Sequence, residues 1–206
     1  MQHNDWDIRY KKNDTPWENG LPQQEMQRLF MSYISPGETV LEIGCGLGTN
    51  ALWLANAGFK VSAIDLSPTA IEFAKNKSAQ AGLAINFQIM DFLKDWRKLS
   101  VFNVIYDCAV FHVFQAQQRQ EFVEHVASIC STNGHWINIS CSEDQSDMIM
   151  RTTGVKSPPY LTAQEIVSDI EPYFELIEMH RCYFPINRGI QGKAEFCAWG
   201  SVFRKR

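Results

Sequence analysis

Apolar runs of strand length alternate with segments of helical period along most of this 206-residue chain. The runs at 39–43 and 60–65 are each followed by a segment long enough for a helix, and the alternation continues toward the C-terminus. Such a pattern predicts βαβ units, in which parallel strands form a sheet that helices cover on both faces. We therefore expect an α/β fold that is doubly wound around one mostly parallel sheet.

Seven strands are expected, and the last two differ from the others. The predicted strands are 39–43, 60–65, 85–89, 102–107, 135–141, 174–183 and 194–203, and the predicted helices are 49–57, 68–81, 117–130 and 162–171. A short, turn-rich connection replaces a helix between the last two strands, which predicts an antiparallel hairpin at the C-terminal edge of the sheet. Residues 1–36 are expected to form a helical or lid segment, and 37–206 the main part of a single domain.

The sequence Gly44-Cys45-Gly46-Leu47-Gly48 joins the first predicted strand to the first predicted helix. Glycines at such a turn let the backbone approach a ligand closely, and the N–H groups of the following helix face that ligand. Thr49 stands where a dinucleotide-binding loop has its last glycine, which disfavours a pyrophosphate ligand. A glycine pattern is a weak signal by itself, so the neighbouring acidic residues decide its interpretation.

Three acidic residues lie at or near the ends of successive strands. Glu42 precedes the loop, where a carboxylate repels phosphate but suits a ligand that carries an ammonium group and a sulfonium. Asp65 ends the second strand, where it can accept hydrogen bonds from both ribose hydroxyls. Asp91 follows the third strand, where it can accept from an adenine amino group, with Phe92 beside the ring. Asp65 and Asp91 could instead cap helices or face solvent, but the ordered set favours the ligand.

These motifs resemble those of the class I S-adenosylmethionine-dependent methyltransferases over about residues 38–203. The resemblance implies a Rossmann-like fold with S-adenosylmethionine as cofactor, and a sheet whose last strand is antiparallel. It also implies that the glycine loop accommodates the methionine end and Glu42 reaches its amino group, while Asp65 holds the ribose and Asp91 reads adenine. The cofactor-side residues of this domain are then Glu42, Gly44, Cys45, Gly46, Gly48, Asp65, Leu66, Asp91, Phe92 and Asp107.

The segment after the fourth strand is expected to face the methyl acceptor. It lacks the Asn/Asp-Pro-Pro-aromatic motif that is usual in nucleic-acid adenine and protein glutamine methyltransferases. Ser157-Pro158-Pro159-Tyr160 looks like that motif but follows the fifth strand, so we interpret it as a rigid turn. Residues 107–112 instead resemble the Asp-x-x-x-x-His segment of thiopurine and halide/thiol methyltransferases. Arg commonly follows that aspartate and can bind an anionic substrate, so Cys108 at this position disfavours an acidic acceptor.

His112 and Asp107 are the candidate catalytic residues. Methyl transfer from a sulfonium is an in-line displacement, in which holding the nucleophile and methyl group in line can supply ~7–11 kcal/mol. A hydroxyl or ammonium acceptor needs a base, whereas a thiolate or halide does not. His112 could be that base or orient the acceptor, or it could be a packed core residue.

The N-terminal segment is rich in aromatic residues. Trp6 and Tyr10 resemble the Trp-x-x-x-Tyr element, and residues 16–20 the Pro-Trp-x-x-Gly element, that precede the fold in thiopurine-type and tellurite-resistance-type methyltransferases. The resemblance implies that Trp6, Tyr10 and Trp17 cover the cofactor, exclude water and attract the sulfonium by ~0.5–2 kcal/mol each. A compatible alternative is that the tryptophans pin an N-terminal helix onto the sheet.

Charge and composition exclude several classes of protein. The formal net charge is −4 and the only concentrated basic run is 204–206, which disfavours a nucleic-acid partner. The longest apolar stretches are shorter than the roughly 18 residues of a membrane span, and the N-terminus does not resemble a signal peptide. Six scattered cysteines without a C-x-x-C pair indicate reduced, buried thiols. We therefore expect a cytoplasmic protein without a metal site.

The leading hypothesis is S-adenosylmethionine-dependent methyl transfer to a small molecule with a soft nucleophile, such as a thiol, halide or metalloid. One alternative is an O- or N-methyltransferase that uses His112 or Asp107 as a base. A second is a non-catalytic S-adenosylmethionine-binding module, and a nicotinamide-dependent oxidoreductase is the least consistent with the motifs. The sequence leaves open the identity of the acceptor and the choice between monomer and dimer.

Overall fold

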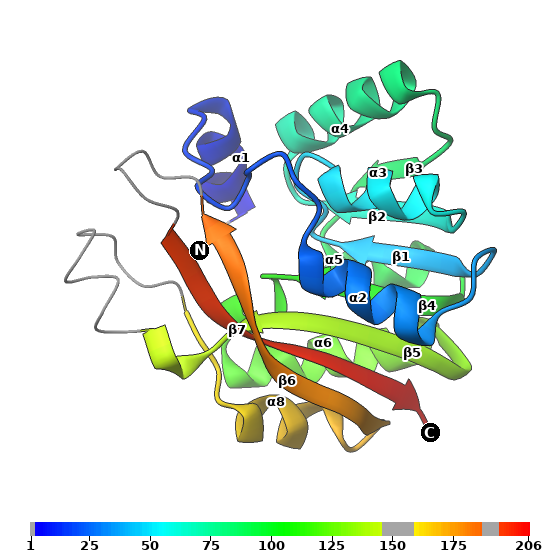
Figure 1. The fold of residues 1–206 in the computed structure, drawn as a ribbon, viewed down its shortest axis with the longest axis vertical. Helices are drawn as coiled ribbons and strands as arrows, with labels where there is room; N and C mark the ends of the chain where they lie inside the picture. The colour runs from blue at the N-terminus through cyan, green and yellow to red at the C-terminus, as the bar shows by residue number, and fades with distance from the viewer. Residues whose placement is uncertain (1–2, 146–158, 187–193) are drawn as a thin grey trace.

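A seven-stranded mixed sheet forms the centre of the computed structural model, which describes residues 3–145, 159–186 and 194–206 (Figure 1). The strands lie in the order β3-β2-β1-β4-β5-β7-β6. Their bounds are β1 Thr39–Ile43, β2 Lys60–Asp65, β3 Asn86–Ile89, β4 Phe102–Cys108, β5 Cys130–Cys141, β6 Phe174–Ile186 and β7 Ala194–Lys205.

One strand, β7, runs against the direction of its neighbours in the sheet. β3, β2, β1, β4 and β5 run parallel, whereas β7 lies between β5 and β6 and is antiparallel to both. The predicted doubly wound, mostly parallel, Rossmann-like sheet with an antiparallel C-terminal hairpin is therefore confirmed. Because the first five strands are parallel, their carboxyl ends meet at one edge of the sheet, which is where open α/β sheets bind ligands.

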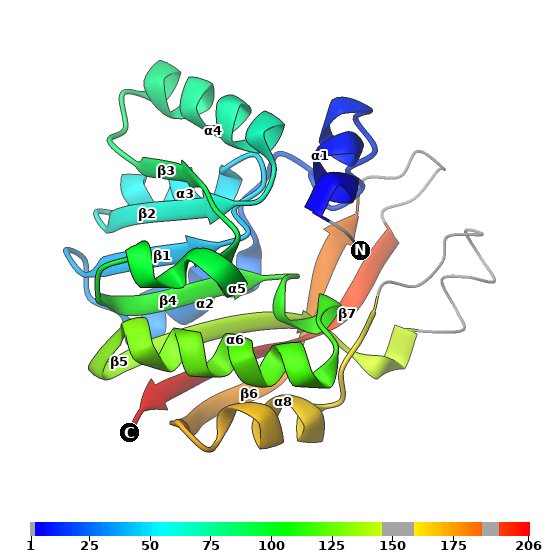
Figure 2. The same cartoon turned by 180° about the vertical axis from the view of Figure 1, so that it is seen from behind.

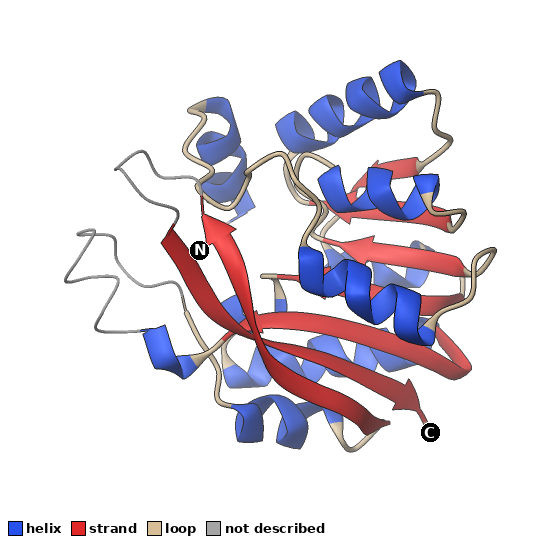
Figure 3. Cartoon of the chain, viewed as in Figure 1, coloured by secondary structure: helices blue, strands red, loops and turns tan. Residues whose placement is uncertain are grey.

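Helices cover both faces of the sheet (Figures 2 and 3). α2, α3 and α4 lie on one face, and α5, α6 and α8 lie on the other, while α1 lies beyond the carboxyl ends of β1 and β2. No helix in the described ranges is long and apolar enough to cross a membrane. The bounds of the helices are α1 His3–Lys11, α2 Gln24–Tyr33, α3 Thr49–Asn56, α4 Pro68–Ala81, α5 Phe92–Asp95, α6 Ala116–Ile129 and α8 Ala163–Ile170.

Local sequence signals explain where two of these helices begin and end. The Ser67 side chain accepts a hydrogen bond from the Ala70 N–H, Pro68 stands in the first turn of α4, and Gly82 ends the helix at a φ of 66°. Thr162 and Glu165 form a capping box at the start of α8, which satisfies two otherwise unpaired backbone N–H groups. These starts and this stop lie where the sequence predicts them.

Other boundaries differ from the prediction. β5 begins at Cys130 instead of His135, because Cys130 pairs with Phe102; an irregularity at 131–134, where Asn133 has a φ of 59°, separates that pair from the regular ladder that starts at His135. The short helix α5 lies where none is expected, and α2 was anticipated only as part of a helical N-terminal segment. α2 buries Met26, Leu29 and Phe30 against the sheet, so tertiary packing of one apolar face stabilises this short amphipathic helix.

Trp136 of β5 lies at the centre of the core between the sheet and α6. Its side chain is fully buried, and the ring centroids of Phe111, Phe174 and Phe203 lie 5.4, 5.6 and 6.3 Å from its own. Its indole N–H donates to Asp107 Oδ2 over 2.9 Å. Burial leaves that N–H no water to bond, so the hydrogen bond to a carboxylate satisfies both groups.

We expect the substitution Trp136→Phe to lower the free energy of unfolding by about 2–4 kcal/mol, because it removes ring volume and a donor to a buried carboxylate. Trp96→Phe is the matched control. The Trp96 indole N–H is buried without a hydrogen-bond partner, so this substitution removes a similar volume and no hydrogen bond. Urea unfolding of both variants measures the difference; equal losses would contradict a stabilising role of the Trp136–Asp107 bond.

Candidate functional site

The loop Gly44–Gly48 lies between β1 and α3 at the carboxyl edge of the sheet (Figure 1). Its three glycines have φ values of 72°, 52° and 75°, in the left-handed region that residues with a Cβ rarely adopt. The N–H groups of Gly44 and Cys45 donate to the Ile64 carbonyl oxygen over 2.8 and 3.0 Å, which ties the loop to β2. The predicted strand–glycine loop–helix unit is therefore present.

Two of these glycines also leave no room for a side chain. A Cβ on Gly44 would collide with the side chain of Val110, which follows β4. A Cβ on Gly46 would lie 2.5 Å from Glu18 Oε1 and 2.8 Å from the Tyr10 hydroxyl, both from the N-terminal segment. The loop is thus in close contact with the turn after β4 on one side and with the N-terminal segment on the other.

Glu42 is almost completely buried beside the loop, with 1% of its surface exposed. Its Oε2 has no hydrogen-bond partner among the described residues. Burial raises the pKa of this carboxyl to about 8, against hydrogen bonds from Asn50 and Ala51 that lower it. A buried acceptor without a donor is costly, and a ligand ammonium group would satisfy it. The buried, unpartnered oxygen of Glu42 therefore fits the amino group of S-adenosylmethionine as its acceptor.

Asp65 lies where the sequence places it, at the end of β2, and it holds the loop in place. Oδ2 accepts from the Gly46 N–H over 2.9 Å and Oδ1 from the Ser67 N–H over 2.8 Å. Burial raises the pKa of Asp65, while these backbone bonds lower it. Each oxygen has a further lone pair, so contacts to a ribose are compatible with this geometry, and the roles of Asp65 and Leu66 at the ribose stay predictions.

Asp91 lies two residues beyond β3 and caps α5. Its Oδ1 accepts from the Leu93 N–H over 3.2 Å and its Oδ2 pairs with Lys94 Nζ at 2.8 Å. Asp91 thus caps a helix in the structure, which is one of the alternatives that the sequence left open. Phe92 is buried, with its ring centroid 4.9 Å from that of Phe122 in the core. The adenine contacts of both residues stay predictions.

Asp107 is completely buried, and both carboxylate oxygens accept hydrogen bonds. The donors are Trp136 Nε1 at 2.9 Å, Asn138 Nδ2 at 3.1 and 3.0 Å, and the Phe111 N–H at 3.0 Å. Burial raises the pKa of Asp107 to about 6, and the hydrogen bonds oppose that rise. In this arrangement Asp107 fixes the turn between β4 and α6, and its carboxylate is not exposed to a ligand.

His112 is also buried, with 3% of its surface exposed. Its Nδ1 accepts from the Cys141 N–H over 3.1 Å, and burial lowers the pKa of the imidazole to about 4. The ring is therefore neutral at pH 7 and carries its proton on Nε2. A ring in this tautomer can donate a hydrogen bond from Nε2 but cannot accept a proton there. The neighbouring Ala109 has a φ of 62° and donates to the Ile139 carbonyl, so the turn is fixed to β5.

The aromatic residues of the N-terminal segment lie together. The ring centroid of Trp17 lies 5.5 Å from that of Trp6 and 6.0 Å from that of Tyr10, and Trp17 Nε1 donates to the Tyr10 hydroxyl over 3.3 Å. The Arg9 guanidinium lies 4.2 Å from the Trp17 ring centroid, so one face of this aromatic group already contacts a cation.

Asp7 anchors α1 to the start of α4. Its Oδ1 accepts from Ser67 Oγ over 2.6 Å and from the Thr69 N–H over 3.0 Å. Hydrogen bonds from Lys11 and Ser67 lower the pKa of Asp7 well below its usual range. α1 is therefore attached to the same strand–helix junction that holds Asp65, and the alternative that the tryptophans pin this helix onto the sheet stays a prediction. A role as a lid stays a prediction.

Glu18 contacts the loop, although the sequence interpretation did not assign it to the site. Its Oε1 accepts from the Leu47 N–H over 3.0 Å, and burial raises the pKa of its carboxyl. The one sequence feature that could have indicated this role is its position next to Trp17 in the Pro-Trp-x-x-Gly element. The positions of residues 18 and 47 in the sequence do not by themselves predict that they lie in contact.

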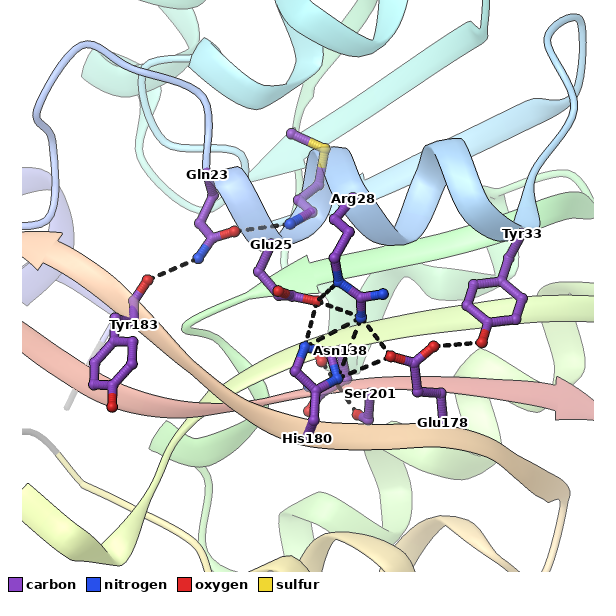
Figure 4. Close-up of polar contacts among 10 residues, drawn as sticks. Gln23, Glu25, Arg28, Tyr33, Asn138, Glu178, His180, Tyr183 and Ser201 are labelled. Atoms are coloured by element: carbon purple, nitrogen blue, oxygen red, sulfur yellow. Dashed lines mark hydrogen bonds and ion pairs between the residues drawn. The ribbon is translucent and has the colours of Figure 1, made fainter.

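A set of polar contacts connects the N-terminal segment and α2 to β6 (Figure 4). Asn19 Nδ2 donates to the Pro185 carbonyl over 3.2 Å, and Gln23 Nε2 to the Tyr183 carbonyl over 3.1 Å. The Gln23 N–H donates to Asn50 Oδ1 over 2.9 Å, next to the buried Glu42. The segment is thus attached both to the cofactor side and to the C-terminal hairpin. Further along α2, charged side chains continue the contact with β6: Glu25, Arg28, Glu178 and His180.

The Ser157-Pro158-Pro159-Tyr160 motif falls partly outside the described residues, which resume at Pro159. Tyr160 is exposed and precedes the capping box of α8. The interpretation of this stretch as a rigid turn stays a prediction.

The raised pKa of Glu42 should make the free energy of unfolding depend on pH. A carboxyl whose pKa is higher in the folded protein stabilises the fold below its unfolded pKa of about 4.5 and loses that contribution as pH rises toward about 8. We expect Glu42→Gln to reduce the fall in the free energy of unfolding between pH 6 and pH 8.5 by about 2–3 kcal/mol. Urea unfolding at both pH values measures it, with the exposed Glu72→Gln as the matched control; parallel curves for wild type and Glu42→Gln would contradict it.

Curated relatives at low identity are methyltransferases, and the names of two of them give a small-molecule or thiol acceptor. The 2-heptyl-1-hydroxyquinolin-4(1H)-one methyltransferase of Mycobacteroides abscessus is 30% identical over 123 residues, which cover 59% of this chain and 54% of that protein. The probable thiol methyltransferase 2 of Arabidopsis thaliana is 26% identical over 157 residues, which cover 75% of this chain and 66% of that protein. The aligned parts therefore span less than two thirds of these two relatives.

A solved structure supports the fold, and a family model identifies the family. The structure, described by the conversion of a disulfide bond into a thioacetal group during echinomycin biosynthesis, superposes with a TM-score of 0.88 at 23% identity and covers 99% of this chain and 93% of its own. The family model, described as Thiopurine S-methyltransferase (TPMT), matches residues 1–183. The chain belongs to the thiopurine S-methyltransferase family and is an S-adenosylmethionine-dependent methyltransferase.

Proposed function

We propose that this protein transfers the methyl group of S-adenosylmethionine to a sulfur atom, or to a similarly soft nucleophile, of a small molecule. The observation that carries the proposal is the state of the two candidate bases. Asp107 is buried with both oxygens hydrogen-bonded, and His112 is neutral with its Nδ1 occupied by the Cys141 N–H. Because neither of these two residues is free to accept a proton, the described part of the site suits a nucleophile that is already deprotonated.

The bound cofactor supplies an electrophilic methyl group and leaves as a neutral thioether. The protein would hold it with the glycine loop, with Glu42 at the amino group and with Asp65 at the ribose. The turn that Asp107 fixes would form the wall next to the acceptor, and Cys108 there offers no positive charge to an anionic substrate. The chain thus contributes mainly position and exclusion of water, which suits an in-line displacement.

Residues 1–36 would act as a lid on the methyltransferase domain formed by 37–206. Tyr10 and Glu18 already contact the glycine loop, and Asn19 and Gln23 reach β6 on the opposite side. A segment with contacts on both sides of the loop could exclude water from the reacting atoms. The names of the plant relatives, a thiol methyltransferase and a thiocyanate methyltransferase, support a sulfur acceptor.

A second candidate function is methyl transfer to an oxygen or nitrogen of a small ring compound. The mycobacterial relative favours it, because its named substrate is a hydroxylated quinolinone. For this function His112 would have to give up its bond to the Cys141 N–H, or donate from Nε2 to orient the acceptor.

We expect the purified protein to methylate a panel of small thiols with labelled S-adenosylmethionine. Since no base is used, kcat/KM should rise with pH up to the pKa of each thiol and level off there, so the break moves from thiol to thiol. Gly46→Ala, whose Cβ would collide with Glu18, is the inactive control. Turnover only with RNA or protein, or a break at one pH for all thiols, would contradict the proposal.

His112→Asn separates the two candidate functions. The asparagine oxygen can replace Nδ1 as the acceptor for the Cys141 N–H while the imidazole is lost, so we expect kcat with thiols to stay within about threefold of wild type. An acid–base role predicts a loss of about 10²–10⁴-fold instead. Steady-state kinetics with thiols and hydroxyquinolinones measures both, and the affinity for S-adenosylmethionine should not change.

A further inference from the structure

Three carboxylates surround the glycine loop, and one of them comes from the N-terminal segment. Asp65 Oδ2 accepts from the Gly46 N–H over 2.9 Å, and Glu18 Oε1 accepts from the next N–H, that of Leu47, over 3.0 Å. Glu42 is buried beside the loop, and within the described part of the chain its Oε2 has no hydrogen-bond partner. Two successive backbone N–H groups of the loop thus donate to Asp65 and Glu18. The third carboxyl, that of Glu42, has an oxygen that receives no hydrogen bond from the described residues.

The negative charge around the loop is only partly balanced. The charges of Glu18 and Asp65 disfavour ionisation of Glu42, and Asp65 acts in the same way on Glu18. Asp7 adds to the negative charge near Asp65, and Lys77 is the cation that acts on Glu18. Like charges in a buried site repel strongly, so a cationic ligand gains more here than a neutral one.

The methyl donor and its product differ in charge. S-adenosylmethionine carries a sulfonium and an ammonium group against one carboxylate, whereas the thioether that remains after transfer has lost the sulfonium charge. We propose that Glu18 is a specificity-determining residue of the cofactor site, which makes the protein bind the cationic donor more tightly than the neutral product. Glu18 would act on the cofactor and not on the acceptor, so its role does not depend on whether the methyl acceptor is a thiol.

Glu18 is the carboxylate of the three that can be tested with the least disturbance. Its contact to the loop uses Oε1, and a glutamine oxygen can accept from the Leu47 N–H in the same way. Glu18→Gln therefore removes the charge and keeps the hydrogen bond. Asp65 bonds two backbone N–H groups with both oxygens, and Glu42 is packed beneath the loop, so their substitution would alter the loop itself.

Calorimetric titration at pH 8 with three ligands tests the proposal. The ligands are S-adenosylmethionine, S-adenosylhomocysteine, and sinefungin, a stable analogue with an amine in place of the methylated sulfonium. For Glu18→Gln we expect the two cationic ligands to bind about tenfold more weakly, or about 1.4 kcal/mol. S-adenosylhomocysteine should bind less than about threefold more weakly. Glu18→Asp should keep more of the preference, because it keeps the charge.

Asp14→Asn is the matched control within the same segment. Asp14 pairs with Arg9 on the surface, and Arg9 Nε also donates to the Asp14 carbonyl oxygen, a bond that the substitution keeps. This variant loses the same charge away from the loop and should leave all three affinities within about twofold. An equal loss for all three ligands in Glu18→Gln, tighter binding of any of them, or the same change in Asp14→Asn would overturn the proposal.

Discussion

The buried carboxylate of Asp107 holds together the part of the sheet on which the site depends. It is bonded to Trp136 and Asn138 of β5 and to the backbone of Phe111 beyond β4. An ionised group in the core is tolerated only where donors compensate for lost hydration, so these bonds fix the turn after β4 in one conformation. That turn brings Val110 against Gly44, and it places His112 next to Cys141. The cofactor loop therefore rests on a wall whose shape a hydrogen-bonded carboxylate sets.

The fold was predictable because its signals are local and repeated. Periodicity gave the alternation of strands and helices, and Ser67, Pro68 and Gly82 marked a helix from start to stop. The antiparallel hairpin followed from the absence of a helix between the last two strands. β5 was predicted too short because Ser131 to Gly134 resemble a turn; the strand starts before this irregular stretch, where Cys130 pairs with Phe102, and no local signal reports that pairing.

The site was predictable in part, for a different physical reason. Glu42, the glycine loop and Asp65 follow from the topology, because the carboxyl ends of adjacent parallel strands must lie together. The hydrogen bonding and protonation of His112 and Asp107 could not be predicted in this way. They depend on which backbone N–H or indole N–H lies next to each side chain in the folded protein. Glu18 was missed for the same reason: its contact with Leu47 joins residues that are far apart in the chain and that no repeat relates.

The place of β7 has a consequence for the order of assembly. β7 is the last strand along the chain, yet it lies between β5 and β6 and is hydrogen-bonded to both. During synthesis on a ribosome, β5 and β6 would therefore both be made before the strand that joins them. Until β7 arrives, β5 offers an open edge and β6 has no partner in the sheet, a state prone to intermolecular pairing. This edge of the sheet would accordingly be completed last, after the parallel strands β1 to β5 had been made.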